Sequence, residues 1–336
     1  MVMNYSLVYI GFAFNHHKGT HAGYHHIKEY VKYDYVIDTQ RYAEMCSISN
    51  PSIFKKAWRR FLKIEYILKC IWLALYKGNV MFHFIYGENN YFNNPLLHLR
   101  RSKVIVTFHQ PFSWFKEKQK WLDKLKSIDE IILVSKSEID LFKSITGKDN
   151  VRFFPHGICS DFYCSDSIVP RENIILMVGN WLRDFSFASR IFKRLEQVSP
   201  STKVIVVTNK NNAHFFNENI NVNVLSGISD EELRNLYRKT SCLFLPLERY
   251  TANNALLEAG AVGCNILIAS NYADNSYIPK EYIEICPLDE KLALQNLLKV
   301  MKRKSNINLA EFVKLHYSWD AVGIQVEKFV KCLNEK

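Results

Sequence analysis

Short apolar runs alternate along the whole chain with segments of helical periodicity. Each apolar run is bounded by polar or turn-forming residues, as is typical of buried strands. In the first half of the sequence, strands are predicted over 6–14, 35–38, 81–85, 104–108, 130–134 and 152–154. In the second half, strands are predicted over 173–178, 203–208, 222–225, 242–247, 265–269 and 284–286. Helices are predicted over 20–32, 53–77, 115–126, 136–145, 185–197, 229–239, 254–262, 288–303 and 319–333.

This alternation predicts an α/β fold with two doubly wound domains of about 150 residues each. The polar segment SDSIVPRE, at 165–172, separates the two halves. We therefore expect an N-terminal domain over 1–164, a C-terminal domain over 165–312, and a final helical segment over 313–336.

The composition is that of a soluble globular protein, with 48% hydrophobic and 23% charged residues among 336. The eight cysteines include no CxxC pair, which favours buried free thiols in a reducing compartment. The first apolar run follows no basic segment and precedes no small-residue cleavage site, so it predicts a strand rather than a signal peptide. No stretch approaches the roughly 18 apolar residues of a membrane span. We expect a cytoplasmic protein.

The segment 243–269 predicts a strand, a polar loop, a helix and a second strand of a parallel sheet. Ligands of open parallel sheets bind at the carboxyl ends of the strands, and anions favour helix N-termini. The polar loop therefore supplies candidate binding residues: Glu248, Thr251, Ala252, Asn253 and Asn254.

Glu258 is predicted to lie one turn inside this helix, on the same face as Asn254. Its carboxylate could accept two hydrogen bonds from a cis-diol such as a ribose. Alternatively, Thr251 or Asn253 only caps the helix, and Glu258 is paired within the protein.

A second candidate segment, Gly179-Asn180-Trp181-Leu182-Arg183, follows the strand predicted over 173–178. A glycine at the end of a buried strand lets a phosphate approach backbone N–H groups, and Arg183 could pair with that phosphate. The alternative is an ordinary turn.

In the N-terminal half, polar residues follow several predicted strands. His109 comes directly after the strand 104–108, and Glu88 comes after the strand 81–85, so either could reach a ligand or serve only its own loop. A loop after the first strand adds candidate substrate-binding residues: His17, Gly19, Thr20 and His21. Because no carboxylate or cysteine set accompanies these histidines, we expect no metal site. The sequence GTHAGY also departs from the GxGxxG pattern of dinucleotide-binding proteins.

The predicted helix over 53–77 interleaves basic with aromatic residues. Such a helix can lie in the interface of an anionic membrane, and the net charge of +11 favours an anionic partner. It can equally be a core-packed helix with a solvated basic face. No nucleic-acid-binding motif accompanies the charge, so we expect no nucleic-acid partner.

These segments, in this order and spacing, resemble retaining glycosyltransferases of family 4, which have the glycosyltransferase-B fold. The resemblance spans nearly the whole chain, and its N-terminal part rests on His109, Ile131–Ser135 with Lys136-Ser137-Glu138, and Phe154-Pro155-His156-Gly157-Ile158 with Phe162. Its C-terminal part rests on Val178-Gly179, Gly227 with Ser229–Leu233 and Tyr237, and Leu257-Glu258-Ala259-Gly260-Ala261-Val262-Gly263.

The sequence departs from the family pattern in two places. Many members have two glutamates separated by seven residues, but Tyr250 stands where the first glutamate would precede Glu258. The loop reads Thr-Ala-Asn-Asn, a variant that resembles one subset of the family, and backbone amides of 251–254 are then expected to hold the donor sugar. Of the usual basic pair for the diphosphate, only Arg183 is evident, with Arg249 or Arg190 as helpers.

The resemblance implies two Rossmann-like domains that face each other across a cleft, with the final helix packed back on the N-terminal domain. It implies an enzyme that moves a sugar from a nucleotide-sugar donor to a glycan or lipid-linked glycan, with retention of configuration and without a metal or other cofactor. Arg183 would stabilise the leaving diphosphate, Glu258 would bind the ribose, and His109 would position the donor sugar. The implied setting is bacterial surface polysaccharide synthesis, including lipopolysaccharide, by a peripheral enzyme on the inner face of the cytoplasmic membrane.

Two alternatives stay open at the level of sequence. One is an inactive member of the same fold that only binds a nucleotide sugar or serves as a scaffold. The other is a different two-domain nucleotide enzyme, such as a sugar epimerase or a dehydrogenase.

Overall fold

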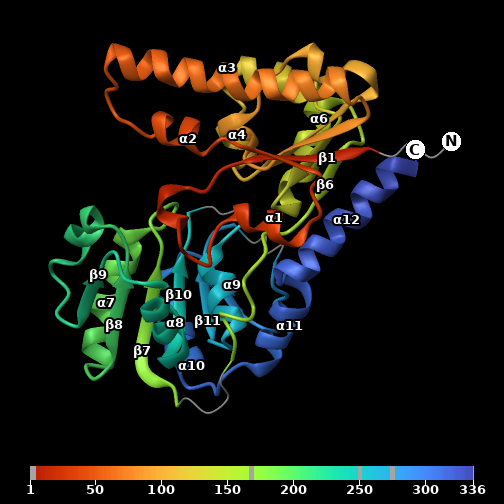
Figure 1. Cartoon of the computed structure of the whole chain (residues 1–336). Coiled ribbons are helices and arrows are strands. Elements are labelled where there is room, and N and C mark those ends of the chain that lie inside the picture. Colours follow the sequence, from red (N-terminus) through yellow and green to blue (C-terminus); the bar gives the residue numbers. More distant parts are fainter. Residues whose placement is uncertain (1–4, 166–169, 249–251, 273–276, 336) are drawn as a thin grey trace. The chain divides into compact units, whose positions relative to one another are not determined.

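The computed structural model describes residues 5–165, 170–248, 252–272 and 277–335 (Figure 1). The chain divides into two compact units, of which the first comprises Met1–Gly157 and Trp319–Lys336 and the second comprises Ile158–Ser318. The division falls at Gly157 rather than at the expected residue 164. Residues after Gly157 belong to the second unit because the Ile158 N–H donates to the Tyr317 carbonyl at 2.7 Å.

The first unit is built on a six-stranded parallel sheet of order β2-β1-β3-β4-β5-β6. Its strands are β1 (Ser6–Gly11), β2 (Tyr35–Asp38), β3 (Val80–Phe84), β4 (Lys103–Phe108), β5 (Glu130–Leu133) and β6 (Val151–Phe153). Its α-helices are α1 (Ile27–Tyr30), α2 (Gln40–Cys46), α3 (Ile53–Tyr76), α4 (Gly87–Asn90), α5 (Gln119–Lys126), α6 (Ile139–Thr146) and α12 (Trp319–Glu335).

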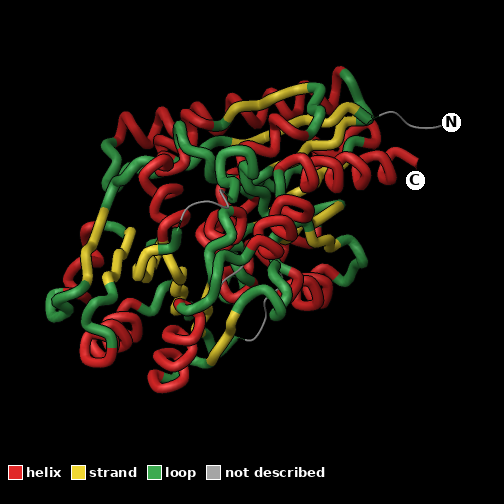
Figure 2. Tube along the Cα trace, turned by 90° about the horizontal axis from the view of Figure 1, so that it is seen from below, coloured by secondary structure: helices red, strands yellow, loops and turns green. Residues whose placement is uncertain are grey.

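The second unit is built on another six-stranded parallel sheet, of order β12-β11-β10-β7-β8-β9. Its strands are β7 (Glu172–Val178), β8 (Lys203–Val207), β9 (Val222–Leu225), β10 (Thr240–Pro246), β11 (Ile266–Ala269) and β12 (Glu284–Cys286). Its α-helices are α7 (Phe185–Val198), α8 (Asp230–Lys239), α9 (Asn254–Ala261), α10 (Glu290–Met301) and α11 (Ile307–Tyr317). In both units the strands are flanked by helices (Figure 2), so the predicted α/β class with two doubly wound sheets is confirmed.

Parallel sheets with helices on both faces bury their strands completely, which explains the near-continuous apolar runs in the sequence. Every residue of β3 and of β10 is buried. The final helix, α12, packs within the first unit against α1, where the Lys32 N–H donates to Glu327 at 2.9 Å. A Cβ at Gly323 would come within 2.4 Å of the Tyr30 carbonyl oxygen, so only glycine allows this close helix contact.

Several predicted boundaries are wrong for local reasons. The strand predicted over 6–14 ends at Gly11, because Phe12 and Phe14 pack their rings on Tyr86 in a loop instead. The helix predicted over 20–32 is reduced to a 3₁₀ turn at Tyr24–His26 followed by α1. Gly23, with a φ of 108°, adopts a conformation that a helix does not contain. Helices α2, α4 and α11 were not predicted.

Candidate functional site

The candidate residues of the second unit lie at the point where the order of its sheet reverses direction. Strands β7 and β10 are neighbours there, while β8 continues on one side and β11 on the other. Loops at the carboxyl ends of two such strands diverge and leave a crevice, which is where open α/β sheets bind ligands. Gly179 follows β7, and the loop to α9 follows β10.

Arg183 links these two loops. Its Nε donates to the Val178 carbonyl at 3.0 Å, and its Nη2 donates to Asn253 Oδ1 at 3.1 Å. The guanidinium lies against Gly179, where a Cβ would come within 2.6 Å of Nη2. Gly179 also has a φ of 120°, so glycine is required both for its backbone conformation and for the space that Arg183 fills.

The Arg183 guanidinium stays cationic in this position. Desolvation by burial lowers its pKa to about 10, still well above neutral pH. A further hydrogen bond, from Nη1 to the Trp181 carbonyl at 3.0 Å, fixes the side chain. Each Nη carries two hydrogens, so the group keeps donors beyond those bonds for an anion.

Asn253 is the N-cap of α9, and its side chain is buried with 5% exposure. Its Oδ1 accepts from both Arg183 and the Leu256 N–H, which orients the carboxamide and leaves Nδ2 as a donor. Nδ2 has no hydrogen-bond partner among the described residues. The first N–H groups of any α-helix also lack partners within the helix. A cation, an orphan amide donor and a helix N-terminus therefore meet at one point, which suits an anionic ligand.

Glu258 is buried on α9 and accepts a hydrogen bond from the Tyr237 hydroxyl of α8 at 2.9 Å. Burial raises the pKa of this carboxyl to about 7, against the lowering effect of the Tyr237 bond. The internal pairing considered from the sequence is thus present on Oε2. A hydrogen bond to one oxygen leaves the other carboxyl oxygen as an acceptor for a hydroxyl group.

The other residues predicted for the donor side occupy the same strand ends. Asn180 Oδ1 accepts from the Thr208 hydroxyl at 2.9 Å, and Glu248 is exposed, with its N–H donating to the Leu182 carbonyl at 3.2 Å. Ala252 precedes the Asn253 cap, and Asn254 is the first residue of α9. Thr251 and Arg249 lie outside the described residues. Arg190 pairs with Glu290 of α10, with Nε and Oε1 2.7 Å apart.

In the first unit, the corresponding reversal of sheet order lies between β1 and β3. His109, after β4, and Glu88, on α4 after β3, meet at this edge: His109 Nδ1 and Glu88 Oε1 are 3.5 Å apart. The His109 ring also packs on Tyr24 and Tyr86, with ring centroids 4.9 and 4.7 Å apart. The structure therefore brings together two residues that the sequence placed only on separate loops.

The loop after β1 folds back on itself. The Thr20 hydroxyl donates to the His17 carbonyl at 3.1 Å and accepts from the Ala22 N–H at 3.2 Å. Gly19 has a φ of 71° with open space around its Cα, and His21 follows Thr20 in the same turn. Tyr24 connects this loop to the residues that follow β3, because its N–H donates to the Tyr86 hydroxyl at 2.9 Å.

Three buried imidazoles and one half-buried imidazole, that of His17, lie near this edge. Desolvation by burial lowers the pKa of His17, His83 and His156 to about 3 and that of His25 to about 4. Nearby histidines contribute to each of these shifts, because positive charges close together repel. These four rings are neutral at physiological pH, so they add no positive charge to this edge of the sheet.

Several residues that contact the candidate site residues were not predicted from the sequence to do so. Tyr86 lies two residues after the end of β3, and His109 directly follows β4, so a similar strand-end argument could have found Tyr86. Tyr237 appeared only as a motif position, and its bond to Glu258 joins two helices. Tyr24 had no signal of its own, because its contacts are tertiary.

Comparison with known proteins gives structural matches alone. No protein-family model matches the sequence, and no curated protein matches it. The structure is similar to a sucrose-phosphate synthase from Thermosynechococcus elongatus, with a TM-score of 0.68, 14% identity, and coverage of 98% of this chain and 99% of that one. It is also similar to the alpha,alpha-trehalose 6-phosphate synthase from Burkholderia multivorans, with a TM-score of 0.65, 8% identity, and 98% of each chain covered.

A third match is a mutant of TarM from S. aureus, solved in complex with Fondaparinux, alpha-GlcNAc-glycerol and UDP. Its TM-score is 0.61 at 11% identity, over 80% of this chain and 58% of that one. These neighbours are glycosyltransferases with two Rossmann-like domains. Likeness at this level of identity establishes the fold. The chain therefore has the glycosyltransferase-B fold.

Proposed function

We propose that this protein is a glycosyltransferase that uses a nucleotide-diphosphate sugar as its donor. The observation that carries the proposal is the orphan Nδ2 of Asn253 beside the Arg183 guanidinium, at the switch point of the second sheet. A diphosphate would satisfy that donor and the helix-start N–H groups together. Glu258, one turn further along α9, would accept from a ribose hydroxyl.

The acceptor would bind to the first unit, through the loop with His17, Gly19, Thr20 and His21 and through Glu88. His109, held between Tyr24 and Tyr86, would orient the transferred sugar. We propose retention of configuration. The bond from the anomeric carbon to the diphosphate oxygen breaks, an acceptor hydroxyl oxygen bonds to that carbon on the same face, and the diphosphate takes the hydroxyl proton.

The charge that develops on the leaving diphosphate would be stabilised by Arg183 and by the N-terminus of α9. These groups are fixed before reaction by the bonds to Val178, Trp181 and Asn253, so they need no reorganisation. We propose that they supply the counter-charge and that no metal is used.

The direct test is turnover. Purified protein is incubated with UDP-, GDP- and ADP-sugars, and release of the nucleoside diphosphate is measured with and without glycan or lipid-linked acceptors. The proposal predicts release that rises when an acceptor is added. Tight nucleotide binding without any turnover would instead indicate an inactive binding or scaffold protein of the same fold.

We extend the proposal to lipid-linked acceptors at an anionic membrane surface, in bacterial surface polysaccharide synthesis. Helix α3 supports this, because an apolar stripe on it faces away from its buried side. Leu62, Tyr66 and Leu73 are buried, whereas these large apolar side chains are at least half exposed: Ile53, Phe54, Trp58, Phe61, Ile64, Leu68, Trp72, Leu75 and Tyr76. Phe54, Phe61, Leu68 and Leu75 recur at intervals of two helical turns and so form one line.

The charge of α3 argues for an anionic lipid surface rather than for a second copy of the chain. Helix α3 has one acidic residue, Glu65, and these basic residues: Lys55, Lys56, Arg59, Arg60, Lys63 and Lys69. Two copies of such a helix would repel each other. Long basic side chains beside an apolar stripe can reach lipid headgroups while the stripe inserts. No helix in the described part of the chain is long and apolar enough to cross a bilayer.

Flotation with vesicles tests this extension. The protein should float with phosphatidylcholine–phosphatidylglycerol vesicles at low salt, and replacing Phe54 and Trp58 by serine should weaken binding by at least about tenfold, because apolar burial is lost. Trp181→Ser is the matched control, since Trp181 is 68% exposed in the second unit. Absence of binding by the unaltered protein would remove the membrane part of the proposal.

A further inference from the structure

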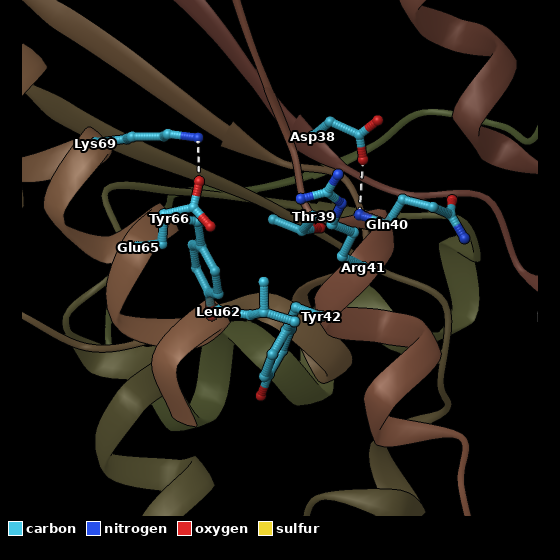
Figure 3. Close-up of a pocket in the computed structure, with 9 residues that line it drawn as sticks. All are labelled: Asp38, Thr39, Gln40, Arg41, Tyr42, Leu62, Glu65, Tyr66 and Lys69. Carbon is cyan, nitrogen blue, oxygen red and sulfur yellow. Dashed lines mark hydrogen bonds and ion pairs between the residues drawn. The ribbon is translucent and has the colours of Figure 1, made fainter. Parts of the chain in front are cut away.

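A polar cavity of about 230 Å³ lies in the first unit, between the end of β2, the start of α2 and one flank of α3 (Figure 3). No residue of the donor or acceptor sites described above lines it. Its lining residues are Asp38, Thr39, Gln40, Arg41, Tyr42, Leu62, Glu65, Tyr66 and Lys69.

The charges around this cavity are balanced. On one wall, Lys69 Nζ and Glu65 Oε1 are 2.7 Å apart. On the other wall, Asp38 accepts from the Gln40 N–H at 2.6 Å, and the exposed Arg41 has no ion pair with another described residue. Because carboxylates and cations are equal in number, the cavity does not select an anion or a cation. It offers both acceptors and donors, which suits a neutral ligand with hydroxyl groups.

The floor of the cavity is apolar. Leu62 and Tyr66 are buried, and the Tyr66 hydroxyl already donates to the Asn90 carbonyl at 3.0 Å. Tyr66 therefore presents its ring rather than its hydroxyl group, and the ring of Tyr42 packs on it with centroids 5.4 Å apart. A sugar ring likewise has apolar C–H faces and hydroxyl groups around its edge, so it matches a cavity with an apolar floor and polar walls.

The cavity and the His109–Glu88 pair lie on the same edge of one parallel sheet. Asp38 ends β2, and His109 follows β4, at the carboxyl ends of strands in the order β2-β1-β3-β4. Three strand spacings of roughly 4.8 Å place β2 about 14 Å from β4. A glycan whose reacting end lies at His109 could therefore extend along the sheet edge to the cavity.

Glu65 also connects the cavity with the exposed stripe of α3. It lies two helical turns after Trp58 and two turns before Trp72, so it interrupts a line of exposed aromatic side chains. Glu65 is paired with Lys69 and also borders the cavity, so this line of exposed side chains turns polar beside the cavity.

We propose that this cavity is a second acceptor subsite, which binds one neutral sugar unit of the acceptor glycan away from its reacting end. The inference rests on the proposed function, which supplies the glycan. The carboxylates of Asp38 and Glu65 accept from sugar hydroxyls, Arg41 and Lys69 donate to sugar oxygens, and the rings of Tyr42 and Tyr66 cover one face of the sugar.

Saturation-transfer NMR on the intact protein tests the proposal without turnover. The probes are neutral methyl glycosides of glucose, galactose, mannose and N-acetylglucosamine. At least one glycoside should show saturation, and Arg41→Ala or Asp38→Asn should weaken its binding by roughly tenfold, because charged hydrogen-bond partners are lost. Lys120→Ala, which removes an exposed cation of α5 outside the cavity, is the matched control.

Absence of saturation with every glycoside, or equal binding by Arg41→Ala and by the unaltered protein, would overturn the subsite. Titration of the same samples with UDP, GDP and ADP separates this outcome from failure of the proposed function. If a nucleotide binds but no glycoside does, the transferase proposal stands and the subsite is contradicted. If a glycoside binds, Arg41→Ala weakens that binding and no nucleotide binds, the sugar site stands and the transferase proposal is contradicted.

Discussion

The carboxamide of Asn253 is held in one orientation by two donors, the Arg183 guanidinium and the Leu256 N–H. Its Nδ2 is consequently buried with nothing described to accept from it. An unsatisfied buried donor costs roughly 1–3 kcal/mol, so a fold rarely retains one without a ligand or water. This single amide group is the residue-scale basis of the proposed diphosphate site.

Asn253→Asp isolates that donor. Aspartate is also a good N-cap and can still accept from Arg183, so the free energy of unfolding should change by less than about 1 kcal/mol. The new carboxylate oxygen would repel a diphosphate, and affinity for the nucleotide should fall by at least roughly tenfold. Calorimetry measures both proteins, with Asn223→Asp, an exposed change of equal charge on β9, as the control. If Asn253→Asp bound the nucleotide as tightly as the unaltered protein does, the diphosphate would not bind at Asn253.

Glu258 makes stability depend on pH in an unusual direction. Its folded pKa of about 7 exceeds the ordinary value of 4.5, so the folded protein binds the extra proton between these values. This contribution to stability is therefore complete below about pH 4.5 and is lost as pH rises through 7, by roughly 3 kcal/mol. Urea unfolding of the unaltered protein and of Glu258→Gln should show a difference in unfolding free energy that changes by this amount. Parallel pH profiles would contradict the raised pKa.

At this scale, the sequence predicted which residues reach the strand ends but not which of them pair. Gly179, Arg183 and Glu258 were each identified from their place after a strand or within a helix. The bonds from Arg183 to Asn253 and from Tyr237 to Glu258 join segments far apart in the chain. Only packing of the strands and helices determines such pairs.

At the scale of elements, Arg171 fixes the helix that carries Tyr237. Its guanidinium donates to the carbonyls of Tyr237, Arg238 and Thr240 at the end of α8, and to the Val262 carbonyl after α9. One side chain thus satisfies carbonyls at the ends of both helices, which would otherwise lack partners. It holds α8 and α9 in the relation that brings Tyr237 to Glu258.

Arg171→Lys should therefore destabilise the protein by on the order of 3 kcal/mol, because an ammonium group cannot span these carbonyls as the planar guanidinium does. Denaturant unfolding measures the change. Arg190→Lys, which alters an exposed ion pair with Glu290, should cost less than about 1 kcal/mol. Similar costs for both substitutions would show that Arg171 has no special role.

The elements themselves were largely predictable, because buried parallel strands leave continuous apolar runs. Each described strand overlaps a predicted one, and helices α3 and α9 begin at the predicted residues. Helix α11 was missed although Leu309, Val313 and Tyr317 have helical spacing and are buried. The exposed face of α3 could not be assigned from sequence, because its apolar residues lie on two sides and only one side is buried.

At the scale of the whole molecule, the two units share one plan: a parallel six-stranded sheet with candidate residues at its switch point. The net charge of +11 suits the two anionic partners that we propose, a nucleotide diphosphate and a lipid surface. The solved neighbours match the fold over nearly the whole chain. The final helix, α12, belongs to the first unit. Both the proposed transfer reaction and the proposed acceptor sites require that the donor binds to the second unit.

Calorimetric titration of the unaltered protein and of Glu258→Ala with UDP, GDP and ADP is the decisive measurement of donor binding. We expect at least one nucleotide to bind. We also expect Glu258→Ala, shown by its thermal melt to be folded, to bind that nucleotide roughly ten- to a hundredfold more weakly, because a ribose contact is lost. No binding by any of the nucleotides to the folded protein, or equal affinity in Glu258→Ala, would contradict donor binding at this site.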